Sequence, residues 1–168
     1  MKPNQPFNQA SPKEINGVKL ALESFPIFES SKEVYDATLE LISHLIKRAE
    51  QGEVNAIYTL GKEAYFQARH FDLPAAIIAR QNGFKLIHYV AAQGHEEAMF
   101  HTAVAMANGL GTEQNIDSAK ELLETLVQTT KHQYTGEKAE RFLTLLNKAI
   151  QNSPTLPPVK KDSPNKGP

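Results

Sequence analysis

The sequence predicts an all-α fold, and two observations support this prediction. Apolar side chains recur three and four residues apart through most of the 168-residue chain, which is the spacing of the buried face of a helix. No stretch alternates apolar and polar residues between hairpin turns, as the strands of a sheet would. The one strand-like stretch, residues 18–22, is equally consistent with a short helix.

The two ends of the chain differ in composition from the part between them. Residues 1–14 contain three prolines, and residues 153–168 contain five of the ten prolines together with three lysines. Such segments bury too little apolar surface to offset the entropy lost on ordering the backbone, about 1–2 kcal/mol per residue. We therefore expect disordered tails at 1–14 and 153–168 and one folded domain over residues 15–152.

Capping residues place the first three helices. We expect a first helix after Ser31, a good N-cap residue, with an apolar stripe that runs to Ala49. A second helix is expected after Gly52. A third is expected after Asp72, another N-cap candidate, with Pro74 in its first turn, where a missing N–H group does no harm.

Glycines divide the rest of the domain. Gly83 predicts a kink or a break within the third helix. The fourth helix is expected to run from Glu96 to about Asn108 and to end at the glycine-rich turn 109–111. Asp117 is expected to cap the fifth helix.

The sequence also resembles itself at an offset of 42 residues. Residues 49–56 align with residues 91–98, which places Gly52 and Gly94 at the same position. A further step of 42 reaches Gly136, which we expect to precede the last helix. The same offsets place one aromatic residue in each unit: Tyr58, Phe100 and Phe142. This periodicity predicts stacked two-helix units that bury each other's apolar faces.

The second unit resembles the Sel-one-like repeats, a branch of the tetratricopeptide-like helical repeats. The similarity lies in the segments Gly94–Ala98 and Ala107–Gly111, in Asp117 and Ala119, and, in the first unit, in the leucine-glycine pair Leu60–Gly61. The chain departs from the family in its longer period and in the pair Thr102–Ala103, which replaces leucine-glycine in the second unit. The resemblance implies a short right-handed α-solenoid of helical hairpins with an N-terminal extension.

Composition argues against several classes of function. With 18 basic and 19 acidic residues, the chain has no overall charge that would attract a nucleic acid or an anionic membrane. It has no cysteine for a disulfide or a thiolate metal site. It also lacks an apolar run of the ~18 residues that a membrane helix needs. Since no export signal is recognisable, we expect a cytoplasmic protein.

No residue pattern predicts catalysis or a cofactor. The six histidines lack the three- or four-residue spacing of metal ligands on one helix face, so we expect surface or helix-capping histidines and no metal site. The serines lie in no nucleophile motif. The turn 109–111 follows a helix, where carbonyl groups and not N–H groups are exposed, so it is not a phosphate loop. We expect no enzyme and no cofactor.

The resemblance also implies where a partner would bind. In tetratricopeptide-like folds the first helix of each pair lines a concave groove. On this basis, the residues expected to face the groove are Asn55, Tyr58, Lys62, Tyr65, Phe66, Glu97, Phe100 and Val104. Aromatic side chains dominate the binding energy of many interfaces, so the aromatic register suits the capture of an apolar peptide or helix. The alternative is that these rings fill the seam between adjacent units.

We therefore predict a non-catalytic scaffold or adaptor that binds another protein or peptide, with no nucleic-acid or membrane partner. One alternative is an immunity or regulatory protein that neutralises a toxin or effector enzyme through the same surface. Another is a small-ligand module whose pocket is formed by Phe71–Gly83 and lined by His70 and Arg80. A homodimer through the end helices, at residues 34–46 or 139–150, is also compatible with a short array.

Overall fold

The computed structural model describes residues 14–18, 32–70 and 73–152, and every regular element in these ranges is helical. A short helix spans residues 14–18. It is followed by α2 (Lys32–Glu50), α3 (Val54–Gln67), η1 (Ala68–His70), α4 (Leu73–Ala91), α5 (Glu96–Asn108), α6 (Ile116–Thr129) and α7 (Gln133–Asn152). The all-α prediction is confirmed. None of the described helices is both long and apolar enough to span a bilayer.

Some predictions lie outside the described residues. These are residues 1–13 of the disordered tail predicted at 1–14, the tail at 153–168, the N-caps Ser31 and Asp72, and residues 19–22 of the strand-like stretch. The remaining residue of the predicted N-terminal tail, Glu14, begins a short helix, so the prediction is wrong there. The part of the strand-like stretch that is described, Val18, ends the short helix and is fully buried. The interpretation as a helix is therefore the one that holds at this residue.

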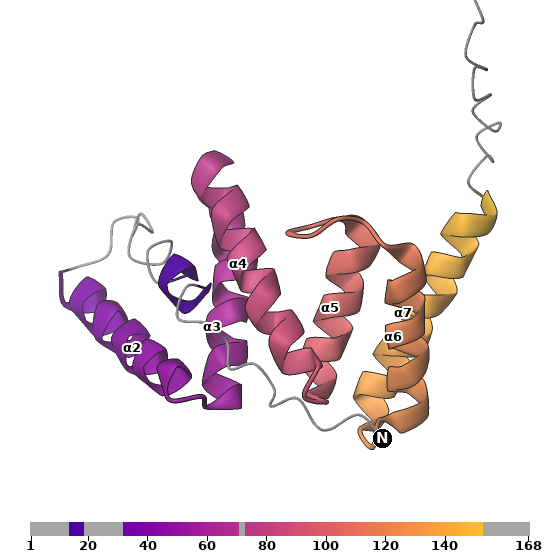
Figure 1. Cartoon of the computed structure of the whole chain (residues 1–168), viewed down its shortest axis with the longest axis horizontal. Coiled ribbons are helices and arrows are strands. Elements are labelled where there is room, and N and C mark those ends of the chain that lie inside the picture. The colour runs from indigo at the N-terminus through magenta and orange to yellow at the C-terminus, as the bar shows by residue number, and fades with distance from the viewer. Residues whose placement is uncertain (1–13, 19–31, 71–72, 153–168) are drawn as a thin grey trace, which may run out of the picture.

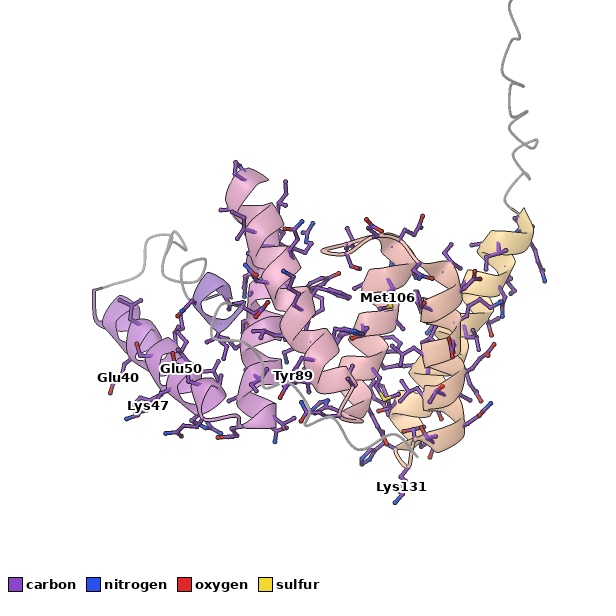
Figure 2. All side chains as sticks on the ribbon, viewed as in Figure 1. Glu40, Lys47, Glu50, Tyr89, Met106 and Lys131 are labelled. Carbon is purple, nitrogen blue, oxygen red and sulfur yellow. The ribbon has the colours of Figure 1, made fainter. Side chains whose placement is uncertain are left out.

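Each helix packs against the next one along the chain. α2 contacts α3, α3 contacts α4, and the same succession continues to α7, while α5 also contacts α7. Figure 1 shows the helices following one another along the long axis, from α2 at one end to α7 at the other. In Figure 2 the labelled side chains of Glu40 and Lys47 lie on the side of α2 that faces away from the other helices.

The closest helix contact joins α3 and α4 through two glycines. A Cβ atom at Gly83 would lie 2.7 Å from the carbonyl oxygen of Gly61 and 2.7 Å from the backbone nitrogen of Tyr65. A Cβ atom at Gly61 would lie 2.8 Å from Cβ of Leu86. Both glycines are required because the two backbones approach too closely for any side chain.

The predicted break at Gly83 is wrong, because α4 runs through it from Leu73 to Ala91. The kink, the other form of that prediction, stays a prediction. A glycine in the middle of a helix weakens it by roughly 0.5–1 kcal/mol relative to alanine. Packing against α3 compensates for this cost and keeps the helix continuous. Gly83 therefore serves the contact between two helices and does not end one.

The turns that precede α3 and α5 have the same backbone geometry. Gly52 and Gly94 have φ values of +83° and +84°, in the left-handed region that favours glycine. The N–H group of each donates a 2.9 Å hydrogen bond to the carbonyl oxygen three residues earlier, Ala49 or Ala91. The offset of 42 residues is thus visible in these two turns.

The prediction for Gly136 is wrong. It lies inside α7, which begins at Gln133, and its φ is not positive. The chain turns earlier, where Thr130 has an extended backbone and its N–H group donates to the carbonyl of Leu126. A glycine at this repeat position is compatible with either a turn or a helix interior. Here the helix begins at Gln133, before the glycine.

The caps of α5 and α6 follow local rules. His95 caps α5, because its Nδ1 accepts a 3.2 Å hydrogen bond from the N–H of Ala98. Gly109, with φ +65°, ends α5 in the left-handed conformation, as predicted. Asn115 caps α6 through a 2.9 Å bond from the N–H of Ser118. The prediction of Asp117 is wrong by two residues, since Asp117 lies in the first turn of α6.

The main core is formed mostly by aliphatic side chains of α2 to α7 and of residues 14–18, together with a few buried aromatic and methionine side chains. The largest fully buried apolar side chains are Val18, Ile57, Leu60, Leu86, Ile87, Val90, Leu123 and Leu126. Among the described residues, one polar side chain, Thr102, is fully buried with them, and its hydroxyl has no hydrogen-bond partner there. It stands 42 residues after Leu60, so both units bury this position.

Candidate functional site

Three of the eight predicted groove residues, Tyr58, Phe66 and Phe100, meet in one cluster of rings. We call this the ring cluster. Its members are Tyr58 and Phe66 of α3, the α5 capping residue His95, Phe100 and His101 of α5, and Phe142 of α7. Alternate helices contribute to it, while α4 and α6 do not. It is therefore a face built from sequence-distant segments.

His101 joins α3 to α5 at the centre of the ring cluster. Its ring centroid lies 6.3 Å from that of Tyr58, with the planes 27° apart, and 5.2 Å from that of Phe66, with the planes 75° apart. Phe100, its neighbour on α5, lies 5.8 Å away. These separations are those of favourable aromatic pairs. The imidazole thus bridges two helices that are separated in the chain by all of α4.

Tyr58 forms the buried end of the ring cluster. Only 5% of its surface is exposed, and its ring lies 4.5 Å from that of His95. The hydroxyl makes no hydrogen bond among the described residues. Burial, reinforced by the carboxylate of Glu97, raises the pKa of Tyr58 well above its usual value. Tyr58 is therefore an uncharged phenol that packs between α3 and α5.

The α7 side of the ring cluster combines rings with a cation. The rings of Phe100 and Phe142 meet edge to face at 6.1 Å. The Nζ atom of Lys138 lies 4.4 Å from the ring centroid of Phe100 and 5.3 Å from that of Tyr134. An ammonium group over a ring face is attracted by the electrons of the ring. Lys138 is thus held against the aromatic surface.

A second lysine occupies the α3 side. The Nζ atom of Lys62 lies 5.6 Å from the ring centroid of Tyr58. Neither Lys62 nor Lys138 forms an ion pair with any residue that the structure describes. Their positive charges remain available beside the rings.

These charges act on His101. Burial lowers the pKa of His101, and the ammonium groups of Lys138 and Lys62 and the ring of His95 lower it further, while Glu97 opposes them. At neutral pH the imidazole is therefore uncharged. It contributes an aromatic surface with a polar edge, and not a third cation.

The rings differ in how much surface they offer to a partner. Phe66 is 45% exposed, and Phe100, His101 and Phe142 are half-buried. A binding partner could therefore contact Phe66 and the half-buried rings, while Tyr58 supports them from beneath.

The other predicted groove residues lie in different surroundings. Tyr65 is nearly buried and reaches the ring cluster only through an edge contact of 5.2 Å with Phe66. Burial raises its pKa, and Arg80 opposes this shift. Glu97 and Asn55 are exposed, and Val104 is half-buried.

Two central residues were missed by reasoning from the sequence: His101 and Lys138. The sequence carries a signal for both. His101 lies four residues after Glu97 and three before Val104, so it shares their helix face. Lys138 lies four residues before Phe142 on α7. Helical spacing extended from the predicted residues would have included both.

Histidines do not assemble into a metal site in the described part of the chain. No group of three or more histidine, aspartate or glutamate side chains in these ranges could hold a metal ion. His95 uses Nδ1 to cap α5, and His101 is surrounded by rings. Both side chains have structural roles.

A separate cleft lies beside the segment that was considered for a small-ligand pocket. Residues 73–83 form the first half of α4. Arg80 lines an open cleft of about 640 Å³ between α4 and residues 109–113. The side chain of His70 lies outside the described part of the structure.

Comparison of the chain with protein-family models, with curated proteins and with solved structures gives no match. The functional argument therefore depends on the residues themselves.

Proposed function

We propose that this chain is a non-catalytic adaptor that binds a segment of a partner polypeptide across the ring cluster. The observation that carries this proposal is the convergence of partly exposed rings from α3, α5 and α7 on one face. Aromatic anchors in such positions supply much of the binding energy of protein interfaces. Lys62 and Lys138 border the same rings and can orient a partner by charge.

The arrangement of the helices supports this assignment. We propose that the chain is a short right-handed α-solenoid of Sel-one-like, tetratricopeptide-like hairpins, with α3–α4 and α5–α6 as its regular units. The equal turns at Gly52 and Gly94 support this architecture. In such an array the first helices of successive hairpins share one side, as the ring cluster requires.

The chemistry of the ring cluster favours binding over catalysis. The polar groups in and beside it are two imidazoles, a buried phenol, two ammonium groups and the carboxylate of Glu97. No serine, threonine or cysteine nucleophile is among these groups. Catalysis by such a nucleophile needs its base within hydrogen-bond reach. We therefore propose an adaptor with no catalytic role and no cofactor, and we expect it in the cytoplasm.

Selection from a displayed peptide library tests the proposal. The library is panned on the wild-type chain, and the enriched peptides are then measured against the double variant Phe66→Ala/Phe100→Ala. Leu145→Ala provides a control, because Leu145 is an exposed apolar side chain of α7 that is not a member of the ring cluster.

We expect the selected peptides to lose at least tenfold in affinity for the double variant and to bind the control like the wild type. If the peptides bind all three proteins equally, the ring cluster is not the binding face. If the double variant unfolds, the two rings belong to the core, and the proposal is also wrong.

Self-association is a second candidate role for the ends of the array. Leu41 on α2 and Leu145 and Ile150 on α7 are exposed large apolar side chains. A homodimer would cover one of these ends. Sedimentation of the wild type and of Leu41→Glu and Leu145→Glu distinguishes the two ends, because only the variant at the true contact dissociates.

A further inference from the structure

The cleft between α4 and the loop that joins α5 to α6 has the size of a binding site. Its volume of about 640 Å³ falls within the ~300–1,000 Å³ typical of ligand pockets. One face of α4 and loop residues 109–113 line it. Figure 1 shows this loop extending from α5 and α6 toward α4. None of the rings of the ring cluster lines it, so it is a separate site.

The loop wall is fixed before any ligand binds. The N–H group of Leu110 donates a 3.1 Å hydrogen bond to the carbonyl of Ala105, which ties the loop to α5. Gly111 has a φ of +77°, and a Cβ atom there would lie 2.6 Å from the carbonyl oxygen of Arg80. Glycine is needed at this contact, because the loop backbone packs directly on α4. A preformed wall spares a ligand the entropy cost of ordering it.

The cleft carries an excess of positive charge. Arg80 and Lys85 of α4 line it, and Glu113 is the acidic residue of its lining. In the described part of the chain, no ion pair and no side-chain hydrogen bond engages Arg80 or Lys85. A guanidinium group presents paired N–H donors that match a carboxylate. The cleft therefore offers an unused site for an anionic group.

Apolar side chains stand next to these charges. Phe84 is nearly buried at the base of the cleft, whereas Ile77 of α4 and Leu110 of the loop are 49% and 42% exposed. Two large apolar side chains facing each other across a cleft leave apolar surface in water that a ligand could cover. A cleft with positive charge beside apolar surface suits a ligand that has both an anionic group and an apolar part.

We propose that this cleft binds an acidic, apolar segment of a partner polypeptide. A carboxylate of the segment pairs with Arg80 and Lys85, and the adjacent apolar side chain enters between Ile77 and Leu110 over Phe84. The open side of the cleft suits a chain that continues beyond it, since a small ligand is usually enclosed over most of its surface. The adaptor then has two binding sites, one on alternate helices and one on α4.

An amide-resolved NMR titration of the full chain tests the site. The probe is an end-blocked tetrapeptide of alternating glutamate and leucine, and the matched control replaces both glutamates with glutamine. We expect saturable shifts of the amides of residues 77–85 and 109–113 with the acidic peptide. We expect no comparable shifts in these ranges with the neutral peptide.

Three substitutions test how each charged side chain of the cleft affects binding of the acidic peptide. Arg80→Gln keeps most of the side-chain stem that packs on the loop and is expected to weaken binding about tenfold or more, the loss of one charged, bidentate contact. Lys85→Gln, at an exposed position, is expected to weaken it a few-fold. Glu113→Gln is expected to tighten it, because a carboxylate no longer repels the probe.

Several results of these experiments would overturn the proposal. Equal binding of the acidic and neutral peptides, or of Arg80→Gln and the wild type, would overturn the proposal. So would shifts confined to residues 95–104, no shifts at all, or shifts at the cleft with inorganic phosphate but not with the peptide. If Arg80→Gln does not fold, the opposite effects of Lys85→Gln and Glu113→Gln decide.

Discussion

The hairpins α3–α4 and α5–α6 begin alike and pack differently. Both start after a glycine with nearly the same positive φ, Gly52 or Gly94, and the same backbone hydrogen bonds. In the first hairpin, Gly61 and Gly83 bring two backbones together. In the second, Ala103 occupies the position of Gly61, and Thr125, which is exposed, occupies the position of Gly83.

This difference separates the part of a helical unit that is fixed from the part that can vary. The turn must reverse the chain, and only a left-handed residue does so in this geometry. The spacing between the two helices of a unit can change, provided that side chains of matching size fill it. The two units therefore share their turns and most buried positions of their first helices, while their second helices bury different positions.

The largest expected effect comes from filling the contact between α3 and α4. Gly83→Ala should lower the free energy of unfolding by about 3 kcal/mol, because its Cβ would collide with two backbone atoms that cannot move independently. Urea denaturation measures the change. The matched control is Thr125→Ala at the equivalent exposed position of α6, which should stay within about 0.5 kcal/mol. A loss below about 1 kcal/mol for Gly83→Ala would contradict the close contact.

Alanine substitutions at the three glycines spaced by 42 residues should change the free energy of unfolding in different directions. Gly94→Ala and Gly52→Ala should each destabilise the protein by about 1 kcal/mol through backbone strain alone, since no atom lies within 4 Å of the added Cβ. Gly136→Ala should stabilise it by roughly 0.5 kcal/mol, because the residue is helical and the close neighbour of the added Cβ, Cγ2 of Thr130 at 3.1 Å, is a side-chain atom that can shift by a few tenths of an ångström. Thermal or urea unfolding of the three variants would show this. Stabilisation by Gly52→Ala or Gly94→Ala would mean that the turns are not as described.

A smaller effect on stability is expected at Thr102, which occupies the same buried repeat position as Leu60. Thr102→Val should raise the free energy of unfolding by about 1 kcal/mol, because it removes a buried hydroxyl without a partner and keeps the shape of the side chain. Thr125→Val, on the exposed side of α6, is the control and should change little. Destabilisation by Thr102→Val would show that the hydroxyl has a partner in solution.

The smallest effect is a pH dependence from the ring cluster. Burial and neighbouring ammonium groups lower the pKa of His101 in the folded chain, so the unfolded chain binds this proton more readily. Stability should therefore fall as the pH drops below about 6.5, the usual pKa of histidine. His101→Gln should flatten this dependence, whereas His44→Gln, an exposed position on α2, should not. An equal slope in His101→Gln would assign the effect to other groups.

Local rules predicted the parts of the fold that depend on neighbouring residues. The end of α5 at Gly109 and the turns at Gly52 and Gly94 follow from a left-handed glycine after an apolar helix. Gly83 could not be placed in this way, since its role depends on a backbone in another helix. Gly136 lies in register but inside a helix, and the register alone does not distinguish these outcomes.

For the candidate site, helical spacing indicated which residues share a face but not how deeply each one is buried. Tyr58, Phe66 and Phe100 were assigned to one face, and the structure brings their rings together through His101. Burial could not be ranked from spacing, because it depends on how closely the helices approach one another. Tyr58 and Tyr65 are nearly buried, whereas Phe66 is exposed. The cleft beside α4 required the position of a loop that lies far along the chain.

The most direct measurement of the central claim combines affinity and stability for a single substitution, Phe66→Ala. Phe66 is the most exposed ring of the cluster, so its loss should cost less than about 1 kcal/mol of unfolding free energy. A peptide selected on the wild type should bind the variant at least tenfold more weakly by calorimetry, as expected for an aromatic anchor. Undiminished affinity in a fully folded Phe66→Ala would contradict the claim that this face binds the partner.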